Sequence, residues 1–532
     1  MKVFIGGAWL YANSKAHAGH LAALLPGDVI ARYYRMKQIE VIYDSGSDCH
    51  GTPITLRANK EGVDPKEIAT KYHEEFKDCF KRLNFSYDIY NNTMDEFHKQ
   101  EVQKYFLEIM KNGYIYEKVE QQDYCETCKK FLSDREIEGT CPHCGGKAKG
   151  DQCDSCLMTL SGKEILNKTC KECGNPTTLK DNNHLYFALS KFQEEIQKLV
   201  NSKKDVWRLN AVNETQKYLN NGLVDRAVTR ELTWGVDTPV KGYENKKIYV
   251  WIEAVFGYLT AAKKYCLQKN IDFEEFFTSE DLRTYYVHGK DNIPFHTVIF
   301  PALLLSLKHG YRLPDYIISS EYLNFGDLKM SKSAGTGIYL KDLLDKFTSD
   351  TIRYYFLANG PEKKDSNFSM DEFINAHNKH LVGEYGNFVN RNLAFLVKKF
   401  DGVVSNGIMN QDIEEELKKS YDVIGSYIEK GELRLAMDQI QKLIMLANKY
   451  YDDSKPWVLV KENIEEFNNV TYTCLNIMAN LANLFEPFLP TSSKKLKEML
   501  KIQETTWNYI TIPGNLHLEN VEILFNRIEN EN

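Results

Sequence analysis

Two short segments of the 532-residue chain carry residue types that bind and neutralise phosphate. In the first, His17 and His20 flank Gly19 where a predicted strand gives way to a predicted helix. The free N–H groups and the dipole of a helix N-terminus favour an anion there. In the second, Lys329 and Lys332 lie in a serine-rich loop with glycines on both sides, and such lysines can neutralise charge that develops on a polyphosphate. Each segment alone is a weak signal, because histidine pairs and lysine-rich loops are often merely solvated.

Eight of the 12 cysteines form four Cys-x-x-Cys pairs, separated by 12, 8 and 13 residues. The pairs are Cys125 and Cys128, Cys141 and Cys144, Cys153 and Cys156, and Cys170 and Cys173. Two pairs supply the four thiolates that zinc favours in closed structural sites. We therefore expect one or two structural Zn²⁺ ions, with an iron–sulfur cluster or free thiols as the alternative. The spacing leaves open whether the pairs combine in sequence or nested, and His143 is expected to be a spectator.

The elements around these segments predict an α/β protein. Residues 3–5, 17–35 and 41–43 have the patterns of a strand, a helix and a strand, a βαβ unit that implies a Rossmann-like parallel sheet. Strand candidates at Lys247–Trp251 and Tyr285–His288 follow the cysteine-rich segment, so we interpret that segment as an insertion that splits one domain. Beyond about residue 365, apolar residues recur at helical spacing, as in 414–430 and 433–451, which predicts an all-α bundle.

These patterns divide the chain into five segments. We predict the first half of the α/β domain at 1–118, the insertion at 119–227 with its cysteine pairs at 125–173, and the second half at 228–320. The lysine-rich loop and a connecting region occupy 321–365, and the helical domain occupies 366–532.

The composition narrows the class of protein further. The formal charge of −7 argues against binding nucleic acid by bulk charge alone, although a local basic groove would suffice for phosphate contacts. No apolar stretch approaches the roughly 20 residues that cross a bilayer, and the N-terminus lacks the pattern of a signal peptide. We therefore expect a cytoplasmic protein with no membrane partner.

The two phosphate-binding segments resemble a known signature pair. His17-Ala18-Gly19-His20 resembles the HIGH motif, and residues 329–333 match KMSKS letter for letter. Together, about 310 residues apart, they are the signatures of class I aminoacyl-tRNA synthetases. The cysteine-rich insertion and the strings at 8–13, 48–53, 250–258 and 289–296 look like those of the methionyl-tRNA synthetases, over nearly the whole chain. The resemblance implies activation of L-methionine with ATP and Mg²⁺, release of pyrophosphate, and transfer of methionine to the 3′-terminal adenosine of initiator and elongator tRNA(Met).

The resemblance also assigns site residues. The catalytic residues are His17, His20, Lys329 and Lys332. The ATP-binding residues are Tyr11, Asn13, His17, Gly19, His20, Lys290, Asp291 and Lys332. The methionine site comprises Trp9, Tyr11, Asp48, Trp251, Ala254, Tyr258, Asn292 and His296, with Asp48 as an anchor for the ammonium group. Aromatic walls suit a polarizable thioether, although each aromatic alone is more often plain core.

The chain departs from the family pattern at a few positions. Ala18 replaces the usual Ile or Leu of the first signature, Leu10 and Val255 replace prolines beside the pocket, and Glu253 replaces an aspartate. These changes put the shape of the pocket in doubt. Because the insertion is filled by cysteine pairs, we expect no editing domain.

By the same resemblance, the helical domain is an anticodon-binding bundle and 321–365 is a stem-contact region. Asn387, Arg391 and Trp457 are expected to read the CAU anticodon, since unpaired bases stack on aromatic or guanidinium planes. His377 and His380 are expected to be solvated helix residues. An appended C-terminal tRNA-binding and dimerisation domain is missing, so we expect a monomer.

Three other functions are compatible with parts of the sequence. Cysteinyl-tRNA synthetase uses an open zinc site, whereas four complete cysteine pairs predict closed ones. A non-catalytic zinc-knuckle RNA-binding paralogue need not retain His17, His20 and Lys332. An unrelated nucleotidyltransferase would leave Asn387, Arg391 and Trp457 unexplained.

Overall fold

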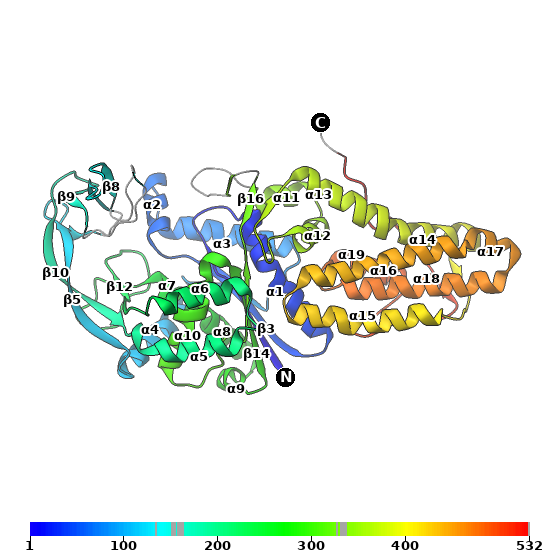
Figure 1. Cartoon of the computed structure of the whole chain (residues 1–532), viewed down its shortest axis with the longest axis horizontal. Coiled ribbons are helices and arrows are strands. Elements are labelled where there is room, and N and C mark those ends of the chain that lie inside the picture. The colour runs from blue at the N-terminus through cyan, green and yellow to red at the C-terminus, as the bar shows by residue number, and fades with distance from the viewer. Residues whose placement is uncertain (133–135, 150–155, 157–163, 326–327, 330–337, 530–532) are drawn as a thin grey trace.

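The computed structural model describes residues 1–132, 136–149, 156, 164–325, 328–329 and 338–529. Figure 1 shows an α/β body, a long two-stranded ribbon at one end and a bundle of long helices at the other. None of the helices in these ranges combines the length and apolarity that crossing a membrane requires.

A six-stranded parallel sheet forms the centre of the α/β body. Its strands are β1 (Lys2–Gly7), β2 (Leu10–Tyr11), β3 (Glu40–Asp48), β4 (Ile89–Asn92), β14 (Leu282–Gly289) and β15 (Tyr316–Ser320). The order is β15-β14-β1-β3, with β4 beside β3 and β2 pairing with the end of β3. Strand β1 is central, and its neighbours β3 and β14 come from opposite sides of the insertion. This arrangement is a topological switch point, and ligands bind at the carboxyl ends of the strands there.

Helices cover both faces of the sheet. Strand residues alternate between two apolar clusters: Val3 and Ile5 pack with α1 (Ala18–Met36), while Phe4 packs with α8 (Gly257–Lys269). The other helices of this body are α2 (Thr52–Glu61), α3 (Pro65–Arg82), α4 (Glu96–Lys111), α5 (Gln193–Lys203), α6 (Leu209–Asn220), α7 (Val250–Glu253), α9 (Phe273–Thr278) and α10 (Phe300–Leu307). This confirms the predicted α/β class, with a parallel sheet whose two halves flank the insertion.

The insertion is carried on an antiparallel ribbon. Strands β5 (Ile115–Cys125) and β10 (Thr178–Phe187) pair along their length, from Ile115 opposite Phe187 to Tyr124 opposite Thr178. The shorter strands are β6 (Lys130–Phe131), β7 (Ile137–Thr140), β8 (Lys147–Lys149), β9 (Leu166–Cys170) and β11 (Arg226–Ala227). Because the cysteines lie at the far end of this ribbon, the sheet register decides which pairs can meet.

One strand prediction was wrong in most of its length. Only Lys247–Ile248 (β13) is a strand, and it pairs with β12 (Thr229–Arg230) outside the central sheet. The residues after Tyr249 form α7. Ile252 of α7 and Val255, two residues beyond its end, are buried in the apolar cluster that also contains Phe4 and residues of α8. The run of β-branched and aromatic residues favours a strand by propensity, but packing of the helical face overrides that preference.

The C-terminal region is mostly helical, as predicted. Its helices are α11 (Leu340–Lys346), α12 (Ser349–Asn359), α13 (Met370–Ala376), α14 (Asn387–Phe400), α15 (Gln411–Glu429), α16 (Leu433–Ser454), α17 (Pro456–Glu462), α18 (Ile464–Phe485) and α19 (Pro490–Met499), with a π-helical segment at His377–Gly386. Short strands also occur: β16 (Leu323–Phe325), β17 (Leu328–Lys329), β18 (Ser366–Phe368), β19 (Val403–Val404) and β20 (Leu516–His517). The prediction of an all-α bundle beyond about residue 365 was therefore wrong for the three short strands β18, β19 and β20.

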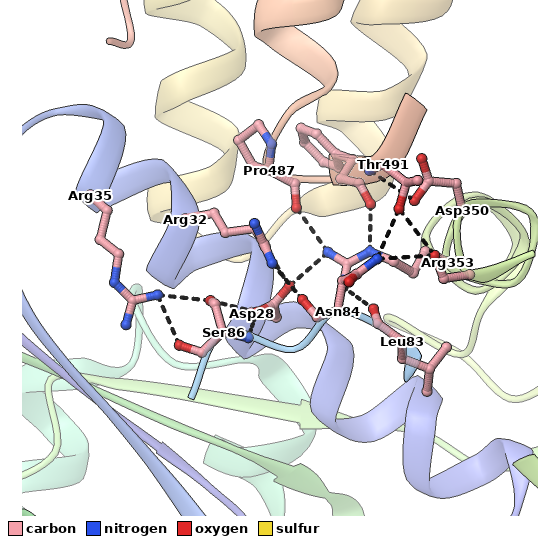
Figure 2. Close-up of polar contacts among 12 residues, drawn as sticks. Asp28, Arg32, Arg35, Leu83, Asn84, Ser86, Asp350, Arg353, Pro487 and Thr491 are labelled. Carbon is pink, nitrogen blue, oxygen red and sulfur yellow. Dashed lines mark hydrogen bonds and ion pairs between the residues drawn. The ribbon is translucent and has the colours of Figure 1, made fainter. Parts of the chain in front are cut away.

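A buried ionic network joins the helical bundle to the α/β body (Figure 2). Asp28 of α1 pairs with Arg353 of α12, and neither side chain is exposed to solvent. Arg353 also donates to the backbone carbonyls of Leu83, Pro487 and Phe488, at 3.2, 3.0 and 2.7 Å. One guanidinium therefore fastens α1, the segment after α3 and the segment after α18.

Three buried asparagines of α18 hold the segment that follows α19. Asn480 exchanges two hydrogen bonds with the backbone of Ile510, at 2.8 and 2.9 Å. Asn476 accepts from the N–H of Ile512 at 3.0 Å, and Asn483 donates to the carbonyl of Thr506 at 2.8 Å. The side chains thus satisfy backbone groups that a sheet would otherwise satisfy. Next to them, Trp507 donates its backbone N–H to the carbonyl of Met36 at the end of α1, at 2.9 Å.

Candidate active site

The first of the two segments expected to bind phosphate lies at the carboxyl edge of the sheet, between β2 and α1. His17 has an extended backbone, and α1 begins at the next residue. The N–H of His17 donates to Nδ1 of His20 at 3.2 Å, and the two imidazole rings stack with centroids 3.6 Å apart. Because Nδ1 of His20 accepts this bond, the neutral ring carries its proton on Nε2.

The structure brings the chain that follows the second segment next to the first. Lys329 is the last residue of β17, which pairs with β16. On the other side of the loop, the N–H of Ala18 donates to the carbonyl of Ile338 at 2.8 Å. A second backbone bond joins Leu340 to the carbonyl of Ala16 at 2.9 Å. Backbone hydrogen bonds thus join the first signature to the residues that follow the second, and Lys332 itself lies outside the described residues.

Neighbouring elements hold the residues before α1 that are expected to bind ATP. Tyr11 lies opposite Asp48 in the parallel pairing of β2 with β3. The carbonyl of Asn13 accepts a hydrogen bond from Nη1 of Arg57 on α2 at 2.7 Å. A Cβ on Gly19 would lie 3.1 Å from the ring of His17, so the glycine gives that ring its space.

Two aromatic residues assigned to the methionine site, Tyr11 and Trp251, lie against each other, and a third, Trp9, packs against two glycines. Trp251 stacks on Phe295, with centroids 4.2 Å apart and planes 13° apart, and approaches the ring of Tyr11 at 6.0 Å. The indole of Trp9 fits between Gly46 and Gly257: a Cβ there would lie 2.8 and 2.7 Å from indole atoms, respectively. The position of Trp9 therefore depends on two glycines in different elements.

Tyr258 and His296 are joined by a hydrogen bond whose direction is fixed. Nδ1 of His296 lies 2.8 Å from the carbonyl of Asn292, so this nitrogen donates. Nε2 must then accept from the hydroxyl of Tyr258, at 2.7 Å. Burial lowers the pKa of His296 to about 4, which keeps the ring neutral and this tautomer in place. His296 lies in a π-helical turn, Phe295–Ile299, a local irregularity that is frequent at functional sites.

A buried acidic pair lies beside these aromatic residues. Asp48 is 2% exposed and accepts a hydrogen bond from the N–H of His50 at 3.2 Å. Nδ1 of His50 lies 3.0 and 3.1 Å from the two oxygens of Glu253, which is fully buried next to Ala254. Burial raises the pKa of Asp48 well above its usual range, and the Glu253 carboxylate raises it further. A cationic amine beside Asp48 would offset both effects.

Lys290 and Asp291 follow β14 in a short 3₁₀ turn, Lys290–Asn292. They line a cavity of about 780 Å³ between α6 and the carboxyl ends of β14 and β15. Asp291 accepts a hydrogen bond from the hydroxyl of Tyr322. Nζ of Lys290 lies 2.6 Å from Oε2 of Glu321, so this ammonium is already paired within the protein.

The cysteine pairs combine in a nested way in the described part of the chain. Cys125, Cys128, Cys170 and Cys173 bring their sulfurs within 4.8 Å of one another, with Cys125–Cys173 at 3.4 Å and Cys128–Cys170 at 3.9 Å. Four sulfurs around a tetrahedral zinc lie about 3.8 Å apart, so this donor set fits the ion. Cys141 and Cys144 lie with Cys156 in a second cluster, and Cys153 lies outside the described residues. His143 is exposed and belongs to neither cluster.

The three residues expected to read an anticodon gather toward one end of the bundle. Asn387 and Arg391 lie one turn apart on α14, and the guanidinium of Arg391 lies over the ring of Tyr451, 4.3 Å from its centroid. Trp457, on α17, is 45% exposed, and its ring is 5.8 Å from that of Tyr451. Arg391 also pairs with Asp452 at 2.7 Å.

The sequence led to a wrong prediction of solvent exposure for one histidine. It also gave no role to several residues that contact the site. His377 is buried rather than solvated: its ring nitrogens lie 3.1 Å from Oγ1 of Thr351 and 2.8 Å from the carbonyl of Asn526. His380 is half-exposed and pairs with Glu384. His50, Glu253 and Phe295 contact the predicted site, and all three lie in the strings that carry the resemblance.

Comparison with known proteins agrees with these observations. Residues 3–393 match the model of the family "tRNA synthetases class I (M)", and residues 403–532 match "Anticodon binding domain of methionyl tRNA ligase". Methionine–tRNA ligase 1 of Alkaliphilus oremlandii is 49% identical over 530 residues, 99% of this chain and 98% of that protein. Methionine–tRNA ligase of Bacillus cereus (strain G9842) is 47% identical over 532 residues, 99% of this chain and 97% of that protein.

A solved structure shares the fold. Mycobacterium tuberculosis methionyl-tRNA synthetase in complex with methionyl-adenylate superimposes with a TM-score of 0.82 over 99% of this chain and 100% of that one, at 24% identity. From the full-length relatives and the two matched models, the chain belongs to the methionine–tRNA ligases, a family of class I aminoacyl-tRNA synthetases.

Proposed function

We propose that this site condenses L-methionine with ATP and then loads the methionine onto initiator and elongator tRNA(Met). In the first step a carboxylate oxygen of methionine attacks the α-phosphorus of ATP, and the bond to the bridging oxygen breaks to release pyrophosphate. In the second, the terminal adenosine hydroxyl of the tRNA attacks the methionyl carbonyl, and AMP leaves. Both steps need positioned reactants and charge stabilisation more than proton transfer.

Each residue set has a role in that reaction. His17 and His20 bind phosphate oxygens at the start of α1, with Gly19 allowing close approach and Lys329 and Lys332 neutralising the leaving pyrophosphate. Tyr11, Asn13 and Asp291 border the nucleotide, and Mg²⁺ accompanies ATP as part of the substrate. Asp48 holds the ammonium of methionine, while Trp9, Tyr11, Trp251, Ala254, Tyr258, Asn292 and His296 surround its side chain.

One observation supports the proposal most directly: the N–H of Ala18, in the first signature, donates to the carbonyl of Ile338, five residues after the second signature. This contact favours a reaction in which the histidines and the lysines of the two signatures act on the same polyphosphate, so that they stabilise the departing charge together. A binding module would have no need for that arrangement.

The remaining parts support transfer to tRNA. We assign a structural Zn²⁺ to each nested cysteine cluster, which would fix the tip of the β5–β10 ribbon. Asn387, Arg391 and Trp457 present a guanidinium and an exposed indole to anticodon bases. We further propose that the protein acts as a monomer in the cytoplasm.

The test is amino-acid-dependent ATP–pyrophosphate exchange with each standard amino acid in the absence of tRNA. Exchange stimulated by methionine alone supports the activation chemistry and the pocket together. Exchange with a different amino acid would overturn the pocket assignment only. A folded, zinc-loaded sample without any exchange would remove the catalytic proposal.

A further inference from the structure

Lys290 is held in an ionic cluster that connects three parts of the chain. Its Nζ lies 2.6 Å from Oε2 of Glu321, just after β15, and 3.1 Å from Oδ1 of Asp365, just before β18. The same ammonium lies 3.9 Å from the ring centroid of Tyr322. Its charge is therefore compensated by two carboxylates and an aromatic face. A phosphate would have to compete with all three for this ammonium.

The cluster lies at the base of the strands that lead to Lys329. The N–H of Tyr322 donates to Oδ1 of Asp365 at 2.9 Å, and the N–H of Ser366 donates to the carbonyl of Tyr322 at 3.0 Å. From this point β16 runs parallel to β18 on one side and pairs with β17 on the other. Lys290 thus holds the residues from which β16 starts, and β16 in turn determines where β17 and its last residue, Lys329, lie.

A second contact joins the residues at the start of β16 to Asp291, which we assign to the ATP site. The hydroxyl of Tyr322 donates to Asp291, the neighbour of Lys290. Oε1 of Glu321 accepts a bond from Asn210 of α6 at 3.0 Å. The end of β14, the starts of β16 and β18, and α6 are therefore fastened together at one wall of the 780 Å³ cavity.

We propose that Lys290 is a positioning residue: it fixes the base of β16 and β18, and through them the strand that carries Lys329, instead of binding a phosphate of ATP. This inference rests on the proposed activation of methionine. Loss of the cluster would misplace a group that acts on the departing pyrophosphate. Because that group stabilises the transition state more than the bound substrate, kcat should fall with little change in KM.

A double-mutant cycle on Lys290 and Glu321 separates positioning from phosphate binding. Glu321→Gln keeps an acceptor for Asn210 but removes the charge facing Lys290. For a positioning pair, Lys290→Met and Glu321→Gln each lower kcat of ATP–pyrophosphate exchange on the order of 10-fold. The double variant is then no worse than the poorer single one, because the two residues act as a unit. Lys290→Arg, which can still reach both carboxylates, restores most of the activity.

A phosphate ligand would behave differently. Glu321→Gln would release the ammonium toward the nucleotide, so exchange would be unchanged or the KM for ATP would fall, while Lys290→Met would raise that KM. The proposal is overturned if Glu321→Gln leaves exchange unchanged or lowers the KM for ATP. It is also overturned if Lys290→Met raises that KM or keeps full activity. Lys363→Met, which breaks an exposed 2.6 Å pair with Glu432, is the matched control and should leave exchange unchanged.

Failure of the proposed function would be visible separately. The wild-type chain would then show no methionine-dependent exchange before any variant is compared. Thermal unfolding of each variant identifies loss of folding, and Lys290→Arg, which keeps the charge, tests the proposal even where Lys290→Met is unstable.

Discussion

Arg353 and Asp28 face each other across the junction of the helical bundle and the α/β body, with Nη2 and Oδ2 2.8 Å apart and neither side chain exposed. A buried pair of this kind adds little compared with a well-packed apolar pair, but removing one partner leaves the other charge uncompensated. Here the guanidinium also satisfies three backbone carbonyls.

Replacement of this arginine should therefore be costly. We expect Arg353→Met to lower the free energy of unfolding in urea by about 3 kcal/mol. The control is Lys418→Met, which breaks an exposed pair with Glu414 and should cost less than about 0.5 kcal/mol. A loss below about 1 kcal/mol for Arg353→Met would mean that the carbonyls and Asp28 find other partners.

The same pair predicts a pH dependence of stability. Burial alone would raise the pKa of Asp28, but Arg32, Arg353 and the hydrogen bonds from Ser86 outweigh it and hold the pKa at about 2. Because the folded pKa lies below the unfolded value of 3.8, the stabilisation is complete above about pH 4 and is lost as the pH falls toward 2. The shift corresponds to about 2 kcal/mol.

Urea unfolding of wild type and Asp28→Asn between pH 7 and pH 2.5 measures this contribution. The difference in stability between the two proteins should shrink as the pH falls below 4. A difference that stays constant over that range would show that Asp28 does not titrate in the way its contacts imply.

The glycine pair around Trp9 predicts a selective defect in methionine binding. A Cβ at Gly257 would lie 2.7 Å from the indole, and a Cβ at Gly46 would lie 2.8 Å from the same ring, so the indole is closely packed against both glycines. The helical backbone at Gly257 accepts alanine, so the effect of Gly257→Ala should be steric. We expect the KM for methionine in exchange to rise about 10-fold while the KM for ATP stays unchanged.

A compensating substitution checks the cause. Trp9→Phe in the Gly257→Ala background removes the crowded ring and should recover part of the affinity for methionine. Equal increases in both KM values, with no recovery, would place the defect in the sheet rather than in the pocket.

The nested cysteine clusters predict the stoichiometry of zinc. We expect two Zn²⁺ per chain in the wild type and one in Cys170→Ser, measured by elemental analysis after dialysis. Methionine-dependent exchange should persist, because none of the residues assigned to activation lies on the β5–β10 ribbon or in the cysteine clusters. Cys474→Ala is the control, since Cys474 lies in the bundle away from both clusters, and it should retain two ions. Loss of both ions on Cys170→Ser would show that the clusters fold as one unit.

The sequence revealed the sheet and the signatures but not the contacts that depend on tertiary register. The βαβ pattern at residues 3–43 and the helical spacing after 365 predicted the architecture, since both are local periodicities. The nested pairing of cysteines could not be predicted, because it follows from the register of β5 against β10. Arg353 carries no sequence signal, since an arginine in a helix is usually exposed.

Errors arose where packing overrides local preference. Val250–Glu253 has β-branched and aromatic residues yet forms a helix, because Ile252 and Val255 are buried together. His377 seemed solvated because its buried partners, Thr351 and the carbonyl of Asn526, are remote in sequence. The residues of the candidate site could be named from the family resemblance. The direction of the Tyr258–His296 hydrogen bond and the pairing of His50 with Glu253 could be seen only in the structure.

The bond between Trp507 and Met36 has a consequence for how the chain is made. The first helix of the sheet domain leaves the ribosome long before Trp507, which bonds to its last residue and lies about 470 positions later in the chain. Until then the face of α1 around Tyr33, which the ring of Trp507 contacts at 5.0 Å, has no cover from that segment. A chain synthesised at about 5–20 residues per second leaves that apolar surface open for tens of seconds. Nascent chains of this protein should therefore be clients of ribosome-associated chaperones until the α18 asparagines have captured residues 506–512.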